Sequence, residues 1–155
     1  MKAIKELCDL VRETAYAIHV YHGHGHLEKV YENALAHRLR KAGIEVIQQH
    51  PLTVYDEDGT VIGEYFADVL VEKRLVVELK ACRALANEHT AQTLGYLKSA
   101  RIEDGLLINF GSYKFEIRKF ILNKVDGHEG TQRAQGVGGA ILSIFSALFA
   151  FFCGQ

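Results

Sequence analysis

The sequence predicts an α/β domain, a compact unit in which both helices and strands contribute to the core. Apolar residues recur at helical spacing through residues 2–41, and from Ile44 onward they alternate with the two-residue period of strands. The 155-residue chain is 48% hydrophobic and has one proline. A chain of this size and composition can bury a core of its own, so we expect one folded domain.

Two amphipathic helices are expected first. The earlier one covers residues 2–21, with apolar residues on one face at Ile4, Leu7, Leu10, Val11, Ala15 and Ile18. It ends at the loop HGHGH, where Gly23 and Gly25 permit a turn. The second runs from His26 to Lys41, and Gly43 occupies the position favoured just after a helix end.

Strand patterns follow from Ile44. They cover residues 44–49, residues 52–66 with a turn at Asp58–Gly59, residues 67–72 and residues 75–81. Asn87 is expected to cap a third helix that extends to about Ala100. Two further strands are expected in GLLINFG (105–111) and KFEIRKFIL (114–122). The order is therefore two helices, several strands, one helix and two strands.

The character of the chain changes after Leu122. Residues 123–139 are polar and rich in glycine and are expected to form a linker, whereas residues 140–155 form an apolar tail. The apolar run at 140–153 is shorter than the roughly 20 residues that span a bilayer. If it forms a helix, apolar side chains lie on all sides of that helix. Three interpretations stay open: membrane contact, self-association into a homo-oligomer, or packing on the domain.

Charge and cysteine content indicate which partners, cross-links and cellular compartment to expect. The formal net charge is -1 and the pI is about 6.7, so a nucleic-acid partner would have to be held by a local patch. Cys8, Cys82 and Cys153 are dispersed and odd in number, which argues against a disulfide framework and a thiolate zinc site. The charged amino terminus lacks a signal-peptide pattern. We therefore expect a cytoplasmic protein.

An acid and a base share one face of the strand LVVELKA, residues 75–81. Side chains alternate along a strand, so Glu78 and Lys80 point the same way, together with Val76. In the preceding strand Phe66, Asp68 and Leu70 share a face. A hairpin about residues 72–74 pairs positions whose numbers sum to about 146, which places Asp68 opposite Glu78, with their β carbons about 4.5–5.5 Å apart.

Two facing carboxylates repel one another unless a cation lies between them. Oxygen ligands suit Mg²⁺ or Mn²⁺, which retain waters and bind substrate phosphates. Such a metal would neutralise both acids and leave Lys80 free to orient or deprotonate water and to stabilise charge on a phosphate. The alternative is a solvated strand face, which the apolar neighbours Phe66, Leu70 and Val76 disfavour.

Two helices contribute further polar candidates. Glu28 is in helical phase with the apolar residues Tyr31, Leu35 and Leu39, and a carboxylate there needs a partner or a metal; alternatively it is an ordinary first-turn acid. Gln92 and Tyr96 lie one turn apart on the third helix and could reach a phosphate, or they could be surface and packing residues. His22, His24 and His26 of HGHGH suggest zinc, but no Cys, Asp or Glu at suitable spacing completes such a site. They are expected to form a polar loop near the mouth of the site, and contact with a metal or a phosphate is the alternative.

Taken in order, these residues resemble a known group of enzymes. Asp68, then Glu78-Leu79-Lys80, with Glu28 before them and Gln92-x-x-x-Tyr96 after them, resembles the RecB-like branch of the PD-(D/E)XK nuclease superfamily. Gly25-His-Leu-Glu28-Lys-Val-Tyr31, together with GLLINFG, is similar to the GxxExxY protein family. The resemblance covers roughly Ile4 to Leu122; Ala67 stands where the superfamily commonly has proline.

The resemblance implies a restriction-endonuclease-like core, with a mixed central β-sheet flanked by helices. It implies hydrolysis of DNA phosphodiester bonds with Mg²⁺ or Mn²⁺. The expected metal ligands are Glu28, Asp68, Glu78 and the carbonyl of Leu79; the expected catalytic residues are Glu28, Asp68, Glu78, Lys80, Gln92 and Tyr96. The alternative is a catalytically silent binding or scaffold protein that keeps the fold and self-associates or attaches to a membrane through residues 140–153.

Overall fold

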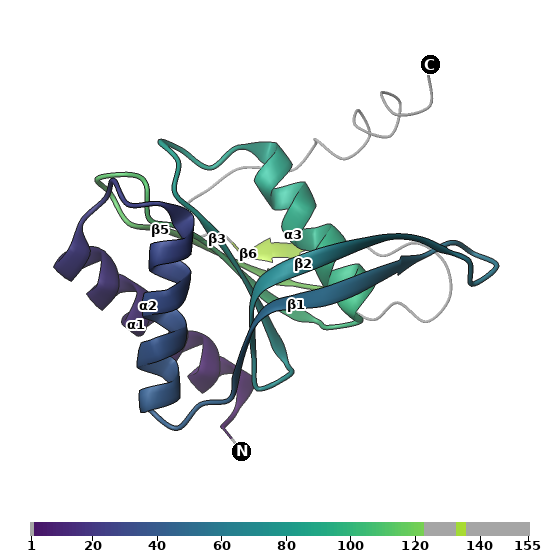
Figure 1. Cartoon of the computed structure of the whole chain (residues 1–155), viewed down its shortest axis with the longest axis horizontal. Coiled ribbons are helices and arrows are strands. Elements are labelled where there is room, and N and C mark those ends of the chain that lie inside the picture. The colour runs from purple at the N-terminus through teal and green to yellow at the C-terminus, as the bar shows by residue number, and fades with distance from the viewer. Residues whose placement is uncertain (1, 123–132, 136–155) are drawn as a thin grey trace.

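The computed structural model describes residues 2–122 and 133–135. In this part of the chain three helices flank one mixed sheet of six strands (Figure 1). The elements are α1 (Ile4–His22), α2 (Glu28–Lys41), β1 (Val46–Tyr55), β2 (Val61–Val71), β3 (Leu75–Lys80), α3 (Asn87–Ala100), β4 (Asp104–Asn109), β5 (Glu116–Ile121) and β6 (Arg133–Gln135). The predicted α/β class is confirmed, and so is the predicted order of elements as far as β5; β6 was not predicted.

The strands lie in the sheet in the same order as in the sequence, from β1 to β6. Neighbouring strands are antiparallel except β3 and β4, which are parallel because the chain crosses between them through α3. The helices α1 and α2 cover one face of the sheet, and α3 covers the other. The strand β3 therefore lies between two apolar layers, which explains its nearly continuous run of apolar residues.

The ends of the helices follow local chemistry, with one exception. Gly43 has φ 78°, and its N–H donates to Arg40 O at 2.9 Å while Ile44 N–H donates to Leu39 O at 3.1 Å, so it closes α2 as predicted. The predicted cap of α3 is wrong. Asn87 is the first helical residue, and the preceding Ala86 donates its N–H to His89 Nδ1 at 3.1 Å.

Residues 44–72 were predicted to contain breaks between strands at residues 50–51 and between residues 66 and 67, but the strands continue through both places. The strands β1 and β2 form one long hairpin that extends away from the rest of the sheet (Figure 1). The turn at Asp58–Gly59 is confirmed, with Asp56 N–H donating to Thr60 O at 2.8 Å. Pro51 does not end β1, because this strand pairs only with β2 and needs donors on one edge alone.

The alternation of β2 fails at Asp68. Leu70 and Ala67 both lie in the α3-side core, although strict alternation would put them on opposite faces, and Phe66 is 49% exposed. The prediction that Phe66 shares a buried face with Asp68 is therefore wrong. On β1 the facing residue Gln49 has φ 51°, and no pairing is formed between the Gln48–Val69 and His50–Ala67 pairs. This local distortion changes which side of the sheet the preceding residues face.

The loop that follows β3 is held against the end of β4. Asn109 is fully buried; its Oδ1 accepts from Cys82 N–H at 3.1 Å and from Gly111 N–H at 3.0 Å, and its Nδ2 donates to Cys82 O at 2.9 Å. A Cβ at Gly111 would overlap the backbone of Ala81 and Cys82. The two strand ends can therefore approach closely only because glycine occupies position 111.

The predicted linker and tail lie almost wholly outside the described residues. Of the predicted linker, residues 133–135 are described and form β6, which pairs with β5. The predicted tail at 140–155 is outside the described part. Within residues 2–122 and 133–135 no helix has the length and apolar character needed to cross a membrane.

Candidate active site

The predicted hairpin register brings the central acids together. Val69 pairs with Val77, Leu70 with Val76 and Val71 with Leu75, so paired numbers sum to 146 as predicted. Asp68 and Glu78 are the next positions along this register, and the negative charge of Asp68 helps to raise the pKa of Glu78. The site therefore forms where β2 and β3 leave their regular ladder, at the carboxyl end of β3.

Asp68 is held by two hydrogen bonds. Its Oδ2 accepts from the backbone N–H of Leu79 at 2.9 Å, and its Oδ1 accepts from Gln49 Nε2 at 3.3 Å. Burial raises the pKa of the Asp68 carboxyl, although the Leu79 N–H and the charge of Lys80 act in the opposite direction. The Asp68 carboxylate thus accepts a backbone hydrogen bond from β3 in place of a carbonyl of the neighbouring strand, which fixes the side chain beside β3.

Glu78 is the most deeply buried acid of the site, at 2% exposure. Its Oε1 accepts from Lys80 Nζ at 2.9 Å, whereas its Oε2 is buried and has no hydrogen-bond partner among the described residues. Burial, and next the charge of Asp68, raise the pKa of Glu78 to about 7. A buried carboxylate oxygen without a partner is costly, so this atom is suited to a cation or a proton.

Lys80 forms an ion pair with Glu78, and both side chains are largely buried. The sequence suggested instead that Lys80 stays free of this acid. Burial alone would lower the pKa of Lys80, but the carboxylates of Glu78, Glu28 and Asp68 together raise it. Lys80 is therefore an ammonium group at neutral pH, surrounded by three acids.

Glu28 faces the same place from α2. It is the first residue of that helix, and its Oε2 accepts from the backbone N–H of Ala81, directly after β3, at 3.2 Å. Desolvation raises the pKa of the Glu28 carboxyl, with the charge of Lys80 opposing and that of Asp68 adding to the shift. The residue is exposed on the surface, so it lies at the mouth of the site rather than in its interior.

Gln92 and Tyr96 approach from α3. Gln92 Nε2 donates to Tyr96 Oη at 2.8 Å, and the Tyr96 ring packs against Tyr65 with centroids 5.2 Å apart. Burial, and next the charge of Glu78, raise the pKa of Tyr96, which shows that its hydroxyl is near the acids. Tyr96 is buried and Gln92 is exposed. Their role at a phosphate stays a prediction.

Two residues that sequence reasoning missed support Asp68. Glu32 on α2 is 3% exposed, and its carboxylate accepts from Lys29 Nζ at 2.6 Å, Gln48 Nε2 at 2.8 Å and Gln49 Nε2 at 2.9 Å. The amide of Gln49 thus bridges Glu32 and Asp68. The available signal was the position of Glu32, one turn after Glu28 and beside the buried stripe of α2.

Replacing Gln49 by methionine is expected to weaken Mn²⁺ binding about 10-fold, the lower end of the effect of losing an outer hydrogen-bond partner. The change removes the amide that holds Asp68 Oδ1 and keeps the length of the side chain. A Mn²⁺ titration followed by electron paramagnetic resonance measures it. Gln48→Met is the matched control, because Gln48 donates to Glu32 and not to Asp68. Equal effects of the two changes would contradict the positioning role of Gln49.

The donor set fits a hard divalent cation. Oε2 of Glu78 has no partner among the described residues, and Asp68 and Glu28 are close enough for their charges to act on Glu78. Mg²⁺ and Mn²⁺ need only one or two carboxylates when waters complete the shell, so an open, partly hydrated ion fits these oxygens. In the described ranges no three His, Cys, Asp or Glu side chains are arranged as a ready metal cage. The histidines of HGHGH, which lie in these ranges, form no such cage.

Comparison with known proteins identifies a family. The family model described as the PD-(D/E)XK nuclease superfamily matches residues 5–120. No curated protein matches the chain, and no solved structure matches it. The matched range contains all the candidate residues described above.

Proposed function

Because the chain belongs to the PD-(D/E)XK nuclease superfamily, we propose that it hydrolyses phosphodiester bonds of DNA with the help of Mg²⁺ or Mn²⁺. Its mixed sheet flanked by helices is the restriction-endonuclease-like core expected of that superfamily. The observation that carries the proposal is the meeting of Asp68, Glu78 and Lys80 at one strand end, with a buried oxygen of Glu78 left without a partner.

In this proposal Asp68, Glu78 and Glu28 hold the metal, directly or through water, and the carbonyl of Leu79 is a further ligand. When bound, the metal makes water more acidic and neutralises charge on the phosphate. Asp68 is kept in place by the Leu79 N–H and by Gln49. Glu28 is kept in place by the N–H of Ala81. The chain thus supplies fixed negative oxygens before any ion arrives, which limits reorganisation on binding.

Lys80 acts as an electrostatic group. Its raised pKa keeps it protonated at neutral pH, so its role is to donate hydrogen bonds to a phosphate oxygen and to stabilise the charge that grows there, rather than to accept a proton. The Tyr96 hydroxyl, with its raised pKa, is likewise a donor, and Gln92 orients it. Both positioning residues approach from the opposite face of the sheet to Glu28.

We also assign the chain to the GxxExxY group of the RecB-like branch. Tyr31, the last residue of that motif, is buried in the core, as the sequence favoured, and stacks on Phe110 with centroids 4.6 Å apart. Its hydroxyl donates to Gly23 O at 2.8 Å and accepts from His26 N–H at 3.2 Å. Tyr31 thereby holds the loop at residues 23–27, which precedes Glu28, through two hydrogen bonds.

The proposal extends to location and assembly. The dispersed cysteines favour the cytoplasm, and DNA is the proposed partner. A homo-oligomer and a membrane contact through residues 140–153 stay predictions, because that segment lies outside the described residues. Native mass spectrometry with and without the last 20 or so residues tests them.

A cleavage assay tests the proposed function. Single-stranded, double-stranded and branched DNA, and RNA as a comparison, are incubated with the protein in Mg²⁺, in Mn²⁺ or in chelator, beside Asp68→Asn. Cleavage of DNA is expected only with a metal and only with the native residue at position 68. Cleavage that persists in the variant would contradict the assigned site. Absence of both cleavage and Mn²⁺ binding would favour the scaffold alternative.

A further inference from the structure

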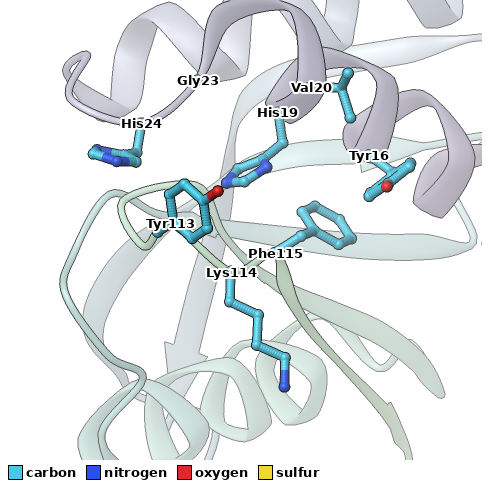
Figure 2. A pocket seen from close by; sticks show the side chains of 8 residues that line it. All are labelled: Tyr16, His19, Val20, Gly23, His24, Tyr113, Lys114 and Phe115. Carbon is cyan, nitrogen blue, oxygen red and sulfur yellow. The ribbon is translucent and has the colours of Figure 1, made fainter.

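A groove of about 710 Å³ lies between α1 and the loop that precedes β5. Its walls come from the second half of α1, from the loop after α1 and from the loop between β4 and β5 (Figure 2). Aromatic and imidazole rings dominate the lining, from Tyr16, His19, His24, Tyr113 and Phe115, with Lys114 at the edge. The volume is in the range of about 300–1,000 Å³ that small-ligand sites in proteins have.

The groove and the acidic site share the same two loops. Gly111 packs on Ala81, the residue whose N–H donates to Glu28. The carbonyl oxygen of the next residue, Ser112, accepts from His19 Nε2 on α1 at 2.8 Å. On the other wall, Gly23 is tied to Tyr31 and leads within five residues to Glu28. The groove is therefore connected through these two loops to Glu28 and to the end of β3, where the acidic site lies.

The rings are arranged as a floor and a rim. Phe115 forms the floor and packs edge-on against Tyr16, with centroids 5.6 Å apart, and at a tilt against His19, also at 5.6 Å. Tyr113 stands at the rim and is 89% exposed; among the described residues its ring contacts only that of His24, at 6.2 Å. An exposed tyrosine ring with one face unoccupied provides a surface on which a flat ligand can stack.

The charge of the lining differs from that of the neighbouring site. No Asp or Glu is among the residues that line the groove in the described chain, and Lys114 extends beyond the ring cluster (Figure 2). Exposed rings beside a cationic side chain are how proteins bind single-stranded nucleic acids, because every base offers a face for stacking and the cation attracts the backbone. A paired base is stacked within its duplex and offers no such face.

We propose that this groove binds an unpaired base of a single-stranded or frayed nucleic acid, next to the phosphate that lies at the acids. The inference rests on the proposed function for its occupant, and it adds a preference for unpaired substrate that the acids alone do not provide. Tyr113 stacks on the base, the rings of Phe115, Tyr16 and His19 form the apolar floor, and Lys114 meets a phosphate of the same strand.

The test measures binding without cleavage. Asp68→Asn in chelator is titrated into a fluorescent oligothymidine, into the same oligomer with abasic positions, and into a duplex of equal length, with anisotropy as the readout. Adding Tyr113→Ala is expected to weaken binding of the oligothymidine about 10-fold, in line with the loss of one stacked base. Tyr55→Ala is the matched control, since Tyr55 is also exposed, at 56%, but lies on the β1–β2 hairpin.

The outcomes separate the two proposals. Equal binding by the Tyr113→Ala and Tyr55→Ala proteins, or equal affinity for the abasic oligomer, overturns the groove assignment even when the native protein cleaves DNA. Tyr113-dependent binding without any cleavage by the native protein supports the groove and overturns the nuclease. Preference for the duplex over the single strand also overturns the groove, because a duplex has no free base to insert.

Discussion

Replacing Lys80 by alanine is expected to lower the rate constant of DNA cleavage by about 10²- to 10³-fold, the usual effect of removing one donor that stabilises developing charge. Affinity for Mn²⁺ is expected to be unchanged or higher, because the change removes a positive charge from among Glu78, Glu28 and Asp68. Single-turnover cleavage measures the rate, and a Mn²⁺ titration measures the affinity. A loss of metal affinity as large as the loss of rate would contradict this role.

The control for that experiment is Lys73→Ala. Lys73 also pairs with a glutamate, Glu45, at 3.3 Å, but it is largely exposed and lies at the other end of the β2–β3 hairpin. Its removal is expected to leave the cleavage rate unchanged, since exposed ion pairs contribute little.

The pH dependence of cleavage provides a second test of Lys80. Its charge lowers the pKa of Glu78, so the Lys80→Ala protein is expected to need a higher pH for activity than the native protein.

The second large expected effect is a dependence of the free energy of unfolding on pH in the absence of divalent cations. The pKa of Glu78 is about 7 in the folded protein and near 4.5 when the carboxyl is unperturbed. Between these values the folded state binds more protons than the unfolded state, so stability falls as pH rises. The free energy of unfolding is therefore expected to be about 3 kcal/mol lower above pH 7 than below pH 4.5 on account of this group.

Urea unfolding in chelator at pH 5 and pH 8 measures this difference. The raised pKa values of Asp68 and Glu28 act in the same direction. In the Glu78→Gln protein the free energy of unfolding is expected to change less with pH, because the contribution of Glu78 is removed. At pH 8 in chelator that variant should be more stable than the native protein. Adding Mn²⁺ at pH 8 should stabilise the native protein more than the variant. A native protein that is as stable at pH 8 as at pH 5 in chelator would contradict the cost assigned to Glu78.

These expectations link fold and chemistry through one buried oxygen. The second oxygen of Glu78 is buried and unpaired among the described residues, and the whole residue is only 2% exposed. A buried carboxylate in this state lowers stability unless a proton or a cation neutralises it. The same feature that would make the site bind a metal therefore makes the metal-free protein sensitive to pH.

Local features were readable in the sequence because they depend on neighbours in the chain. Helical spacing predicted α1 and α2, and Gly43 predicted where α2 closes. The short turn at residues 72–74 predicted the register that places Asp68 beside Glu78. Each of these depends on backbone geometry over a few residues, which residue type controls.

Other features were predicted wrongly or not at all because they depend on contacts between distant segments. Phe66 was expected on a buried face, but the distortion opposite Gln49 breaks the alternation of β2 at Asp68. Glu32 and Gln49 were missed, since only packing of α2 on β1 brings them to Asp68. The pairing of Lys80 with Glu78 likewise reflects burial of that strand end by the surrounding core.

By itself the sequence determined the order of the elements, the pairing of β2 with β3 and the set of side chains that could carry metal chemistry. Their types and spacing are local properties of the chain. The tertiary structure alone decided which of them meet and in what environment: Glu28 is brought from α2 to Ala81, and Tyr96 is brought from α3 to the far side of the acids. Burial between two helical layers then raises the pKa of Glu78 to about 7, because desolvation depends on everything packed around a group and not on its neighbours in sequence.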